Sequence, residues 1–129
     1  MKNLHFGLML LAAVLVAGCV STVNERTAAG FPFIKDRVEG RYARSVDQVF
    51  DAAKDVVRRN GVLVRDSNVY STNIVKTLEG KVNQRSVWMR IEPVDPKITS
   101  VIVQTRTPGG GSDLDLAHEL EKEIALELK

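Results

Sequence analysis

The 129-residue chain has few cysteines and aromatic residues, and it has no marked excess of charge of one sign. Its one cysteine is Cys19, so the chain cannot form an internal disulfide. Aromatic residues make up 5% of the chain, which argues against stacking platforms for bases or sugars. The 18 basic residues nearly balance the 16 acidic ones, whereas a nucleic-acid binder needs concentrated positive charge against the phosphates. The composition therefore indicates a globular protein that does not bind nucleic acid.

Residues 1–18 have the features of an export signal. Lys2 is the only charged residue of a short N-terminal region, and an uncharged, mostly aliphatic run follows from Phe6 to Ala17. Such a run rises about 18 Å as a helix, well short of the roughly 30 Å hydrocarbon core of a membrane. We therefore predict a signal peptide and not a membrane-spanning helix. Its removal leaves 17 basic and 16 acidic residues, a net charge of +1.

The apolar run ends in a short motif, Leu15-Val16-Ala17-Gly18-Cys19. An aliphatic residue, two small residues and a cysteine in this order resemble the lipobox of bacterial lipoproteins. The small residues fit a narrow protease subsite, and the thiol is the only side chain there that is nucleophilic enough to accept a thioether-linked diacylglycerol. The resemblance implies cleavage between Gly18 and Cys19, and acylation of the thiol and the freed amine of Cys19 by chains such as palmitate. The alternatives are an uncleaved anchor or an ordinary secretory signal.

Lipidation of Cys19 would decide where the protein resides. Two or three acyl chains hold a protein on a membrane essentially permanently, because each buried methylene contributes about 0.8 kcal/mol. Acylation would also cap the lone thiol in an oxidising cell envelope. In enterobacterial lipoproteins an aspartate after the cysteine resembles an inner-membrane retention signal, and Val20 stands there instead. We therefore expect a lipid-anchored envelope protein on the periplasmic face of the outer membrane rather than at the inner membrane.

Residues 19–37 are predicted to form the lipidated cysteine and a flexible tether. No strand or helix period persists from Val20 to Asp36, and the Ser, Thr, Asn and Gly residues there favour irregular backbone. At about 3.3 Å per residue this stretch could span at most roughly 55 Å. Within it, Phe31-Pro32-Phe33-Ile34 is an apolar patch that we expect to pack back on the domain, with a partner-binding or interfacial segment as the alternative.

Two amphipathic helices are predicted from the spacing of the apolar residues, over residues 45–60 and 112–128. Ser45 and Gln48 have the spacing of a capping box at the start of the first helix. Asn60-Gly61 is predicted to supply a left-handed stop at its end. Ser112 is the predicted N-cap of the second helix.

Between the helices, four stretches are predicted to be strands, 62–65, 71–82, 85–92 and 98–107, with turns at 66–68, 83–84 and 93–96. Every second residue from Val87 to Ile91 is apolar, so this face of the third strand should be buried and the face with Trp88, Arg90 and Glu92 wet. Val38–Ala43 is a candidate edge strand. Residues 38–129 thus predict a single α+β domain.

The expected architecture is a two-layer sandwich. It has an antiparallel meander of three to five strands with two helices packed on one face, in the order β-α-β-β-β-β-α. About 90 residues suffice for one modest core and leave little for an enclosed active site.

Two segments before and within the last helix invite a chemical interpretation. Pro108–Ser112 precedes a helix as a phosphate-binding loop does, but it lacks the Gly-x-x-x-x-Gly-Lys-Ser/Thr spacing, and Asp113 and Asp115 would repel a phosphate. A simple connector is therefore expected. His118 could bind a metal weakly with Asp115 and Glu119, but no second His or Cys completes a shell.

The chain shows no nucleophile with a recognisable base. Its serines lie in no Gly-x-Ser-x-Gly elbow, and a lone histidine in the mature chain forms no triad order. Glu119 and Glu123 lie one helical turn apart, where solubility explains them better than acid/base catalysis. We therefore expect no catalytic residue, no metal and no cofactor, and we do not expect an enzyme.

Four cations, Lys76, Arg85, Arg90 and Arg106, could form a basic outer face of the sheet. The simpler interpretation is ordinary solvated charge that also protects the sheet edges. The functional interpretation is contact with anionic lipid headgroups, lipopolysaccharide or an acidic partner.

The whole pattern resembles a family of small bacterial lipoproteins that is classed only as a domain of unknown function. The resemblance is carried by the lipobox, a short tether, a helix that ends in Asn60-Gly61 before a strand, a β meander, and the Gly-rich turn Gly109–Asp113 before the last helix. The element order is also similar to the helix-grip domains in the lipoprotein subunit of the outer-membrane β-barrel assembly machine. A likeness of fold transfers no function.

Two functional hypotheses follow. The first is a non-enzymatic envelope lipoprotein whose domain binds another envelope component as an adaptor. The second is a small-ligand or lipid carrier with a cavity between helices and sheet. A cavity lined by Val49, Val56, Met89 and Leu120 would favour the carrier, whereas a solid core with an exposed sheet edge would favour the adaptor.

Overall fold

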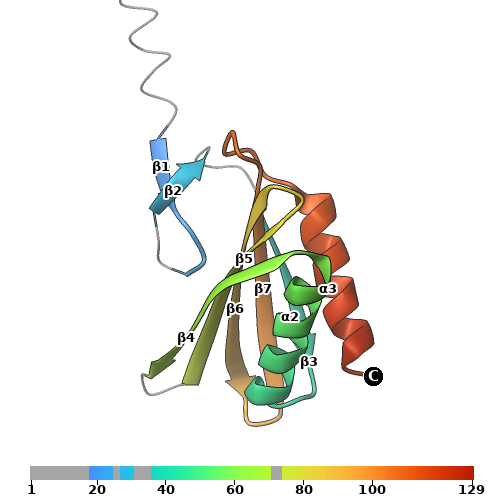
Figure 1. Ribbon diagram of the computed structural model, residues 1–129. Helices are drawn as coiled ribbons and strands as arrows, with labels where there is room; N and C mark the ends of the chain where they lie inside the picture. Colours follow the sequence, from blue (N-terminus) through green and yellow to red (C-terminus); the bar gives the residue numbers. More distant parts are fainter. Residues whose placement is uncertain (1–17, 25–26, 31–35, 71–73) are drawn as a thin grey trace, which may run out of the picture.

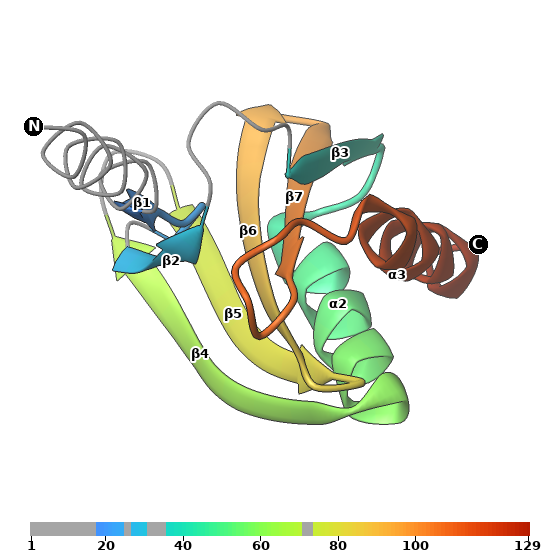
Figure 2. The same ribbon diagram turned by 90° about the horizontal axis from the view of Figure 1, so that it is seen from above.

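The computed structural model describes residues 18–24, 27–30, 36–70 and 74–129. β1 (Gly18–Ser21) and β2 (Thr27–Gly30) form a two-stranded antiparallel sheet. Five further strands form one antiparallel sheet in the order β3-β7-β6-β5-β4. Both helices cover the same face of this sheet (Figure 1), and the sheet curves around them when seen from above (Figure 2).

The elements of the main domain follow one another as predicted. They are β3 (Arg37–Tyr42), α2 (Val46–Asn60), β4 (Val62–Tyr70), β5 (Ile74–Val82), β6 (Arg85–Asp95), β7 (Ile98–Arg106) and α3 (Leu114–Glu127). The α+β class, the two-layer arrangement and the order β-α-β-β-β-β-α are therefore confirmed. The candidate edge strand before the first helix is β3, which pairs with β7.

The hydrophobic core fills the space between the helices and the sheet. Val87, Met89 and Ile91 of β6 point into it and are fully buried, as their alternation predicts. Leu120 and Ile124 of α3 reach the same cluster. Each such side chain contributes about 1.5–3 kcal/mol on burial, so this one core accounts for the stability of the two layers.

Helix α2 begins as predicted but ends differently. The Ser45 side chain accepts a hydrogen bond from the Gln48 backbone N–H at 3.2 Å, and the reciprocal bond completes the capping box. Gly61 has a φ of −174°, so the predicted left-handed stop is wrong. Glycine is needed there for another reason: a Cβ at Gly61 would lie 2.0 Å from the backbone oxygen of Lys81. The chain turns from α2 into β4 directly against β5.

Strand β4 is longer than its sequence pattern indicates. Asp66–Asn68 were expected to form a turn, but they continue the strand, and Ser67 Oγ lies 2.7 Å from Thr77 Oγ1 of β5. The β4–β5 register shifts between Leu63 and Arg65, and this irregularity breaks the alternation that would have marked the strand. Polar residues are tolerated there because β4 is an edge strand of the five-stranded sheet.

The two hairpins around β6 differ in how well they were predicted. The predicted turn at Asn83 and Gln84 is confirmed, and their φ values of 49° and 64° make it a left-handed two-residue turn. The second turn was expected at 93–96, but β6 runs on to Asp95. The Asp95 carboxylate accepts hydrogen bonds from the backbone N–H groups of Lys97 (2.7 Å) and Ile98 (3.0 Å), which sets the turn two residues later.

Helix α3 is capped by Asp113 and not by Ser112. The Asp113 carboxylate accepts the backbone N–H of Leu116 at 3.1 Å, which satisfies one free donor of the first turn. The same carboxylate pairs with Arg85 at the start of β6. Aspartate therefore serves both as the helix cap and as the ionic link to the sheet.

Candidate functional site

The basic outer face, which was the functional alternative for four cations, does not form. Lys76 points to the helix layer, where it also lies over the ring of Phe50, 5.1 Å from its centroid. Each of the four cations pairs with a carboxylate: Lys76 with Asp47, Arg85 with Asp113, Arg90 with Glu92, and Arg106 with Asp36. The four charges are therefore dispersed and neutralised rather than gathered on one surface.

The outer face of the sheet, which lies opposite the helices, is instead closed by a buried polar cluster. Gln104 is fully buried, and Arg106, Trp88 and Asp36 are only 4%, 6% and 7% exposed. Trp88 lies directly opposite Gln104 in the β6–β7 register. The prediction that Trp88 faces water is therefore wrong. We call these four residues the outer-face cluster.

Hydrogen bonds and one ion pair join three members of the outer-face cluster, Gln104, Asp36 and Arg106. Gln104 Nε2 donates to Asp36 Oδ2 at 2.7 Å. The Arg106 guanidinium forms an ion pair with the same oxygen, and both side chains are at most 10% exposed. The Gln104 amide is left with its oxygen pointing away from Asp36, as an acceptor held in place for a backbone donor.

That acceptor is used by the segment that follows Cys19. Val23 donates its backbone N–H to Gln104 Oε1 at 2.7 Å, and Asn24 Nδ2 donates to the Leu78 backbone oxygen at 3.0 Å. Thr22 and Val23 are only 4% and 6% exposed. We call Thr22–Asn24 the strap, because it lies across the outer face within the stretch that was expected to be irregular.

The predicted lipidation site lies immediately before the strap. Gly18 and Cys19 belong to β1, where Cys19 pairs with Ala29 of β2. Residues 15–17 of the lipobox and the apolar patch at 31–34 lie outside the described residues. Lipidation of Cys19 and cleavage after Gly18 stay predictions from the sequence.

The free edge of β4 is the second notable surface. Among the strands described, β4 pairs only with β5. Val62 and Val64 near its start are 63% and 54% exposed, and Ile74 at the start of β5 is 52% exposed. An unpaired strand edge with exposed apolar side chains is a site where another chain can add a strand.

The segment that was compared with a phosphate loop is a connector. The Gly110 backbone N–H donates to the Thr107 oxygen at 2.9 Å, and the Gly111 N–H donates to Thr107 Oγ1 at 3.2 Å. Two amides that would face a phosphate are therefore satisfied within the turn. Gly110 has a φ of 89°, which explains glycine at this position.

His118 lines an open pocket between β3 and α3. The pocket has a volume of about 500 Å³ and is lined by Arg37, Val38, Glu39, Ile102, Leu114 and His118. Hydrogen bonds from the Ser100 hydroxyl (2.9 Å) and then the Arg41 guanidinium (3.0 Å) lower the pKa of Glu39. No group of three or more potential metal ligands occurs among the residues that the structure describes.

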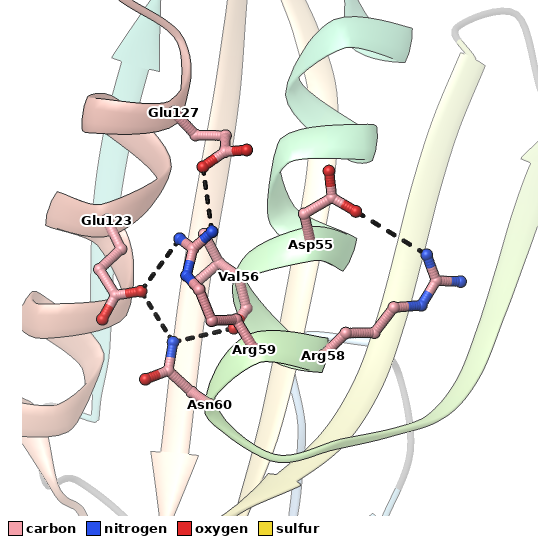
Figure 3. A network of polar contacts seen from close by, with 7 residues as sticks. All are labelled: Asp55, Val56, Arg58, Arg59, Asn60, Glu123 and Glu127. Atoms are coloured by element: carbon pink, nitrogen blue, oxygen red, sulfur yellow. Dashed lines mark hydrogen bonds and ion pairs between the residues drawn. The ribbon is translucent and has the colours of Figure 1, made fainter.

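Figure 3 shows the polar network that joins the two helices. Arg59 of α2 pairs with Glu123 at 3.3 Å and with Glu127 at 3.2 Å. Asn60 Nδ2 also donates to Glu123 Oε2, at 2.7 Å. These two carboxylates, Glu123 first, raise the pKa of Arg59. Glu123 therefore links α3 to α2, whereas Glu119, which lies one helical turn before it, is exposed.

A family model described as a protein of unknown function, DUF3568, matches residues 3–126. The chain belongs to the DUF3568 family. The match confirms the resemblance to a domain of unknown function, and it extends over both the predicted signal peptide and the domain. A search of curated proteins finds no match to this chain. Within the described residues of this DUF3568 protein, no helix is long and apolar enough to cross a membrane.

Trp88 and Arg106 were named from the DUF3568 sequence in other roles, but the four residues of the outer-face cluster were not predicted to form a cluster. Nothing in the sequence pattern of β7 indicates that the strap covers Gln104. The one available signal is Trp88, a large aromatic residue on a face expected to be wet. Asp36 gives no signal of its role in the cluster, because Gln104 and Arg106 lie 68 and 70 residues away in the chain.

Tyr42 offers a test of how β3 is joined to α3. Burial, and then the Glu121 carboxylate that accepts a hydrogen bond from its hydroxyl, raise the pKa of Tyr42. Tyr42→Phe is expected to lower the free energy of unfolding by about 1–2 kcal/mol at neutral pH. The pKa of Tyr42 in the folded protein lies above its unfolded-state value near 10, so the hydroxyl's contribution to stability is complete below about pH 10. It is lost as the pH rises through the folded-state pKa. The difference in unfolding free energy between the native protein and Tyr42→Phe should therefore shrink as the pH rises. Urea titrations of both proteins at neutral pH and at about pH 11 measure this difference. A difference that stayed constant between the two pH values would contradict the prediction.

Proposed function

We propose that this DUF3568 protein is a lipid-anchored lipoprotein of the bacterial envelope, with the outer membrane favoured over the inner, whose domain is a non-enzymatic adaptor. The anchor is supported by the order Leu15-Val16-Ala17-Gly18-Cys19 after an apolar run too short to span a membrane. The adaptor role is supported by the core and by the edge of β4.

The observation that carries the adaptor role is a solid core beside an open sheet edge. Val49, Val56 and Met89 are fully buried, Leu120 is 1% exposed, and all four belong to one packed cluster. A lipid carrier would need a cavity among these side chains. A small-ligand carrier remains the alternative proposal, supported by the pocket of about 500 Å³ between β3 and α3.

The partner we propose is an envelope protein that presents an extended segment to β4. Main-chain hydrogen bonds would give such a segment its affinity, and Val62 and Val64 would be covered by its side chains. An anionic lipid surface is the weaker candidate, because the four cations that might have attracted it each pair with a carboxylate.

Crosslinking in cells tests the proposal. Val64→Lys should lower the yield of crosslinked partner about tenfold or more, because a lysine on an edge strand opposes the addition of another strand. Val94→Lys is the matched control, since Val94 is 45% exposed at the far end of β6, and it should crosslink as the native protein does.

Two outcomes would contradict the adaptor role. One is a crosslinked partner whose yield is the same in the Val64→Lys and Val94→Lys proteins. The other is hydrolysis of esters, glycosides or peptides by the purified domain, lost on change of a single serine or of His118. The second outcome would indicate an enzyme.

A further inference from the structure

The strap brings the proposed lipid anchor close to the folded domain. Only three residues separate Cys19 from Val23, whose backbone N–H is bonded to Gln104. Four residue steps span at most about 14 Å even when fully extended. The predicted tether would have allowed the domain to move several times farther from the lipid.

The contact of the strap with the sheet is built as a specific site. Gln104 is fully buried and makes hydrogen bonds at both ends of its amide, to Val23 on one side and to Asp36 on the other. The Asp36 carboxylate is fixed in turn by the buried Arg106. In the docked state both ends of the buried Gln104 amide have a hydrogen-bond partner, so docking of the strap leaves neither end of this amide unsatisfied.

We infer that the strap holds the domain at the membrane surface, with the outer face of the five-stranded sheet nearest the lipid and with α2 and α3 on the far side. This inference rests on the proposed lipidation of Cys19. It follows from the position of the strap on the face opposite the helices, next to β1 and β2 (Figure 2). The segment that covers the outer-face cluster is therefore the strap of the same chain.

This orientation bears on the partner site. The edge of β4 and the helix layer are left open to other envelope components, whereas the outer face is closed by the strap. The partner would then approach along the membrane or from the side away from it.

Trp88 provides a built-in reporter of the strap. It is the only tryptophan of the chain, it is 6% exposed, and it lies opposite Gln104 on the outer face. Release of the strap should expose Trp88 to water-soluble quenchers. It should also let the domain move away from the membrane, which would lower the energy transfer from Trp88 to labelled headgroups.

Two variants at Val23 distinguish the effect of its backbone hydrogen bond from the effect of its side chain. Val23→Pro removes the N–H that Gln104 accepts, whereas Val23→Ala keeps it and serves as the matched control. Gln104→Leu removes the acceptor from the other side, which guards against an effect of proline on β1. Thermal melts followed by circular dichroism establish that the domain is folded in all three variants.

Iodide quenching of Trp88 in the unlipidated Cys19→Ser protein tests docking alone. Val23→Pro and Gln104→Leu should each raise the quenching constant several-fold, and Val23→Ala should change it little. Equal quenching in all variants would overturn the docked strap.

Energy transfer then tests the position at the membrane. The full lipidated protein is placed in vesicles of phosphatidylethanolamine and phosphatidylglycerol whose headgroups carry dansyl. Transfer from Trp88 should be strong in the native and Val23→Ala proteins and several-fold weaker in Val23→Pro. Unchanged transfer in Val23→Pro would overturn the inference, whereas failure of the native protein to float with the vesicles would overturn the proposed anchor.

Discussion

Replacing Cys19 by alanine is expected to move the protein completely from the washed membrane fraction to the soluble fraction. The chain has no other cysteine, so the variant has no thiol to accept a thioether-linked lipid. With about 0.8 kcal/mol for each buried methylene, two or three acyl chains account for essentially permanent attachment. Fractionation of cells after an alkaline or high-salt wash, with detection of a C-terminal tag, measures the change.

Ser21→Ala is the matched control, because it alters a small residue two positions away and keeps the thiol. It should remain with the membrane as the native protein does. Intact-mass measurement should also show a native chain that begins at Cys19 and carries the mass of a diacylglycerol and a third acyl chain. Retention of Cys19→Ala on washed membranes, or a native protein with a free thiol at residue 19, would refute the lipoprotein assignment.

Elements with a strong local signal were predicted correctly. The capping box at Ser45 is made by residues three positions apart, and the alternation from Val87 to Ile91 needs only neighbours in the same strand. Such signals survive in a single sequence because the physical contacts they report are themselves local. The order of helices and strands then allowed few arrangements, and the two-layer sandwich is one of them.

Strand β4 shows why an edge is hard to predict. Its bulge after Leu63 moves later side chains out of the expected alternation, and the polar residues Asp66 and Ser67 are exposed, so no buried apolar side chain marks this part of the strand. The strand is specified by its antiparallel pairing with β5, which extends from Tyr70 opposite Ile74 to Val62 opposite Lys81. A pattern read along the chain does not contain that pairing.

The candidate site was predicted less well than the fold, because its contacts join distant parts of the chain. Arg106 meets Asp36 across 70 residues, and Val23 meets Gln104 across 81. Cations that look alike in the sequence therefore have separate, specific partners. The motif that ends at Cys19 is the candidate feature that the spacing of residues suggests by itself, and its processing stays a prediction.

Gly61→Ala is expected to destabilise the domain by about 2–3 kcal/mol, although alanine is the better helix former. A Cβ at this position would lie 2.0 Å from the Lys81 oxygen and 3.1 Å from the Val82 Cα, and both are backbone atoms of β5. No side-chain rotation relieves that overlap, so the end of α2 must move away from the sheet. The melting temperature should fall by on the order of 10–20 °C for a domain of this size.

Gly109→Ala is the matched control for this change. Nothing lies within 4 Å of a Cβ built at Gly109, so the same substitution there should alter the free energy of unfolding by less than about 0.5 kcal/mol. Urea titrations of both variants distinguish a local steric effect from a general cost of replacing glycine. If Gly61→Ala were as stable as Gly109→Ala, the close approach of α2 to β5 would have to be wrong, and with it the packing that places the β4 edge beside the helix layer.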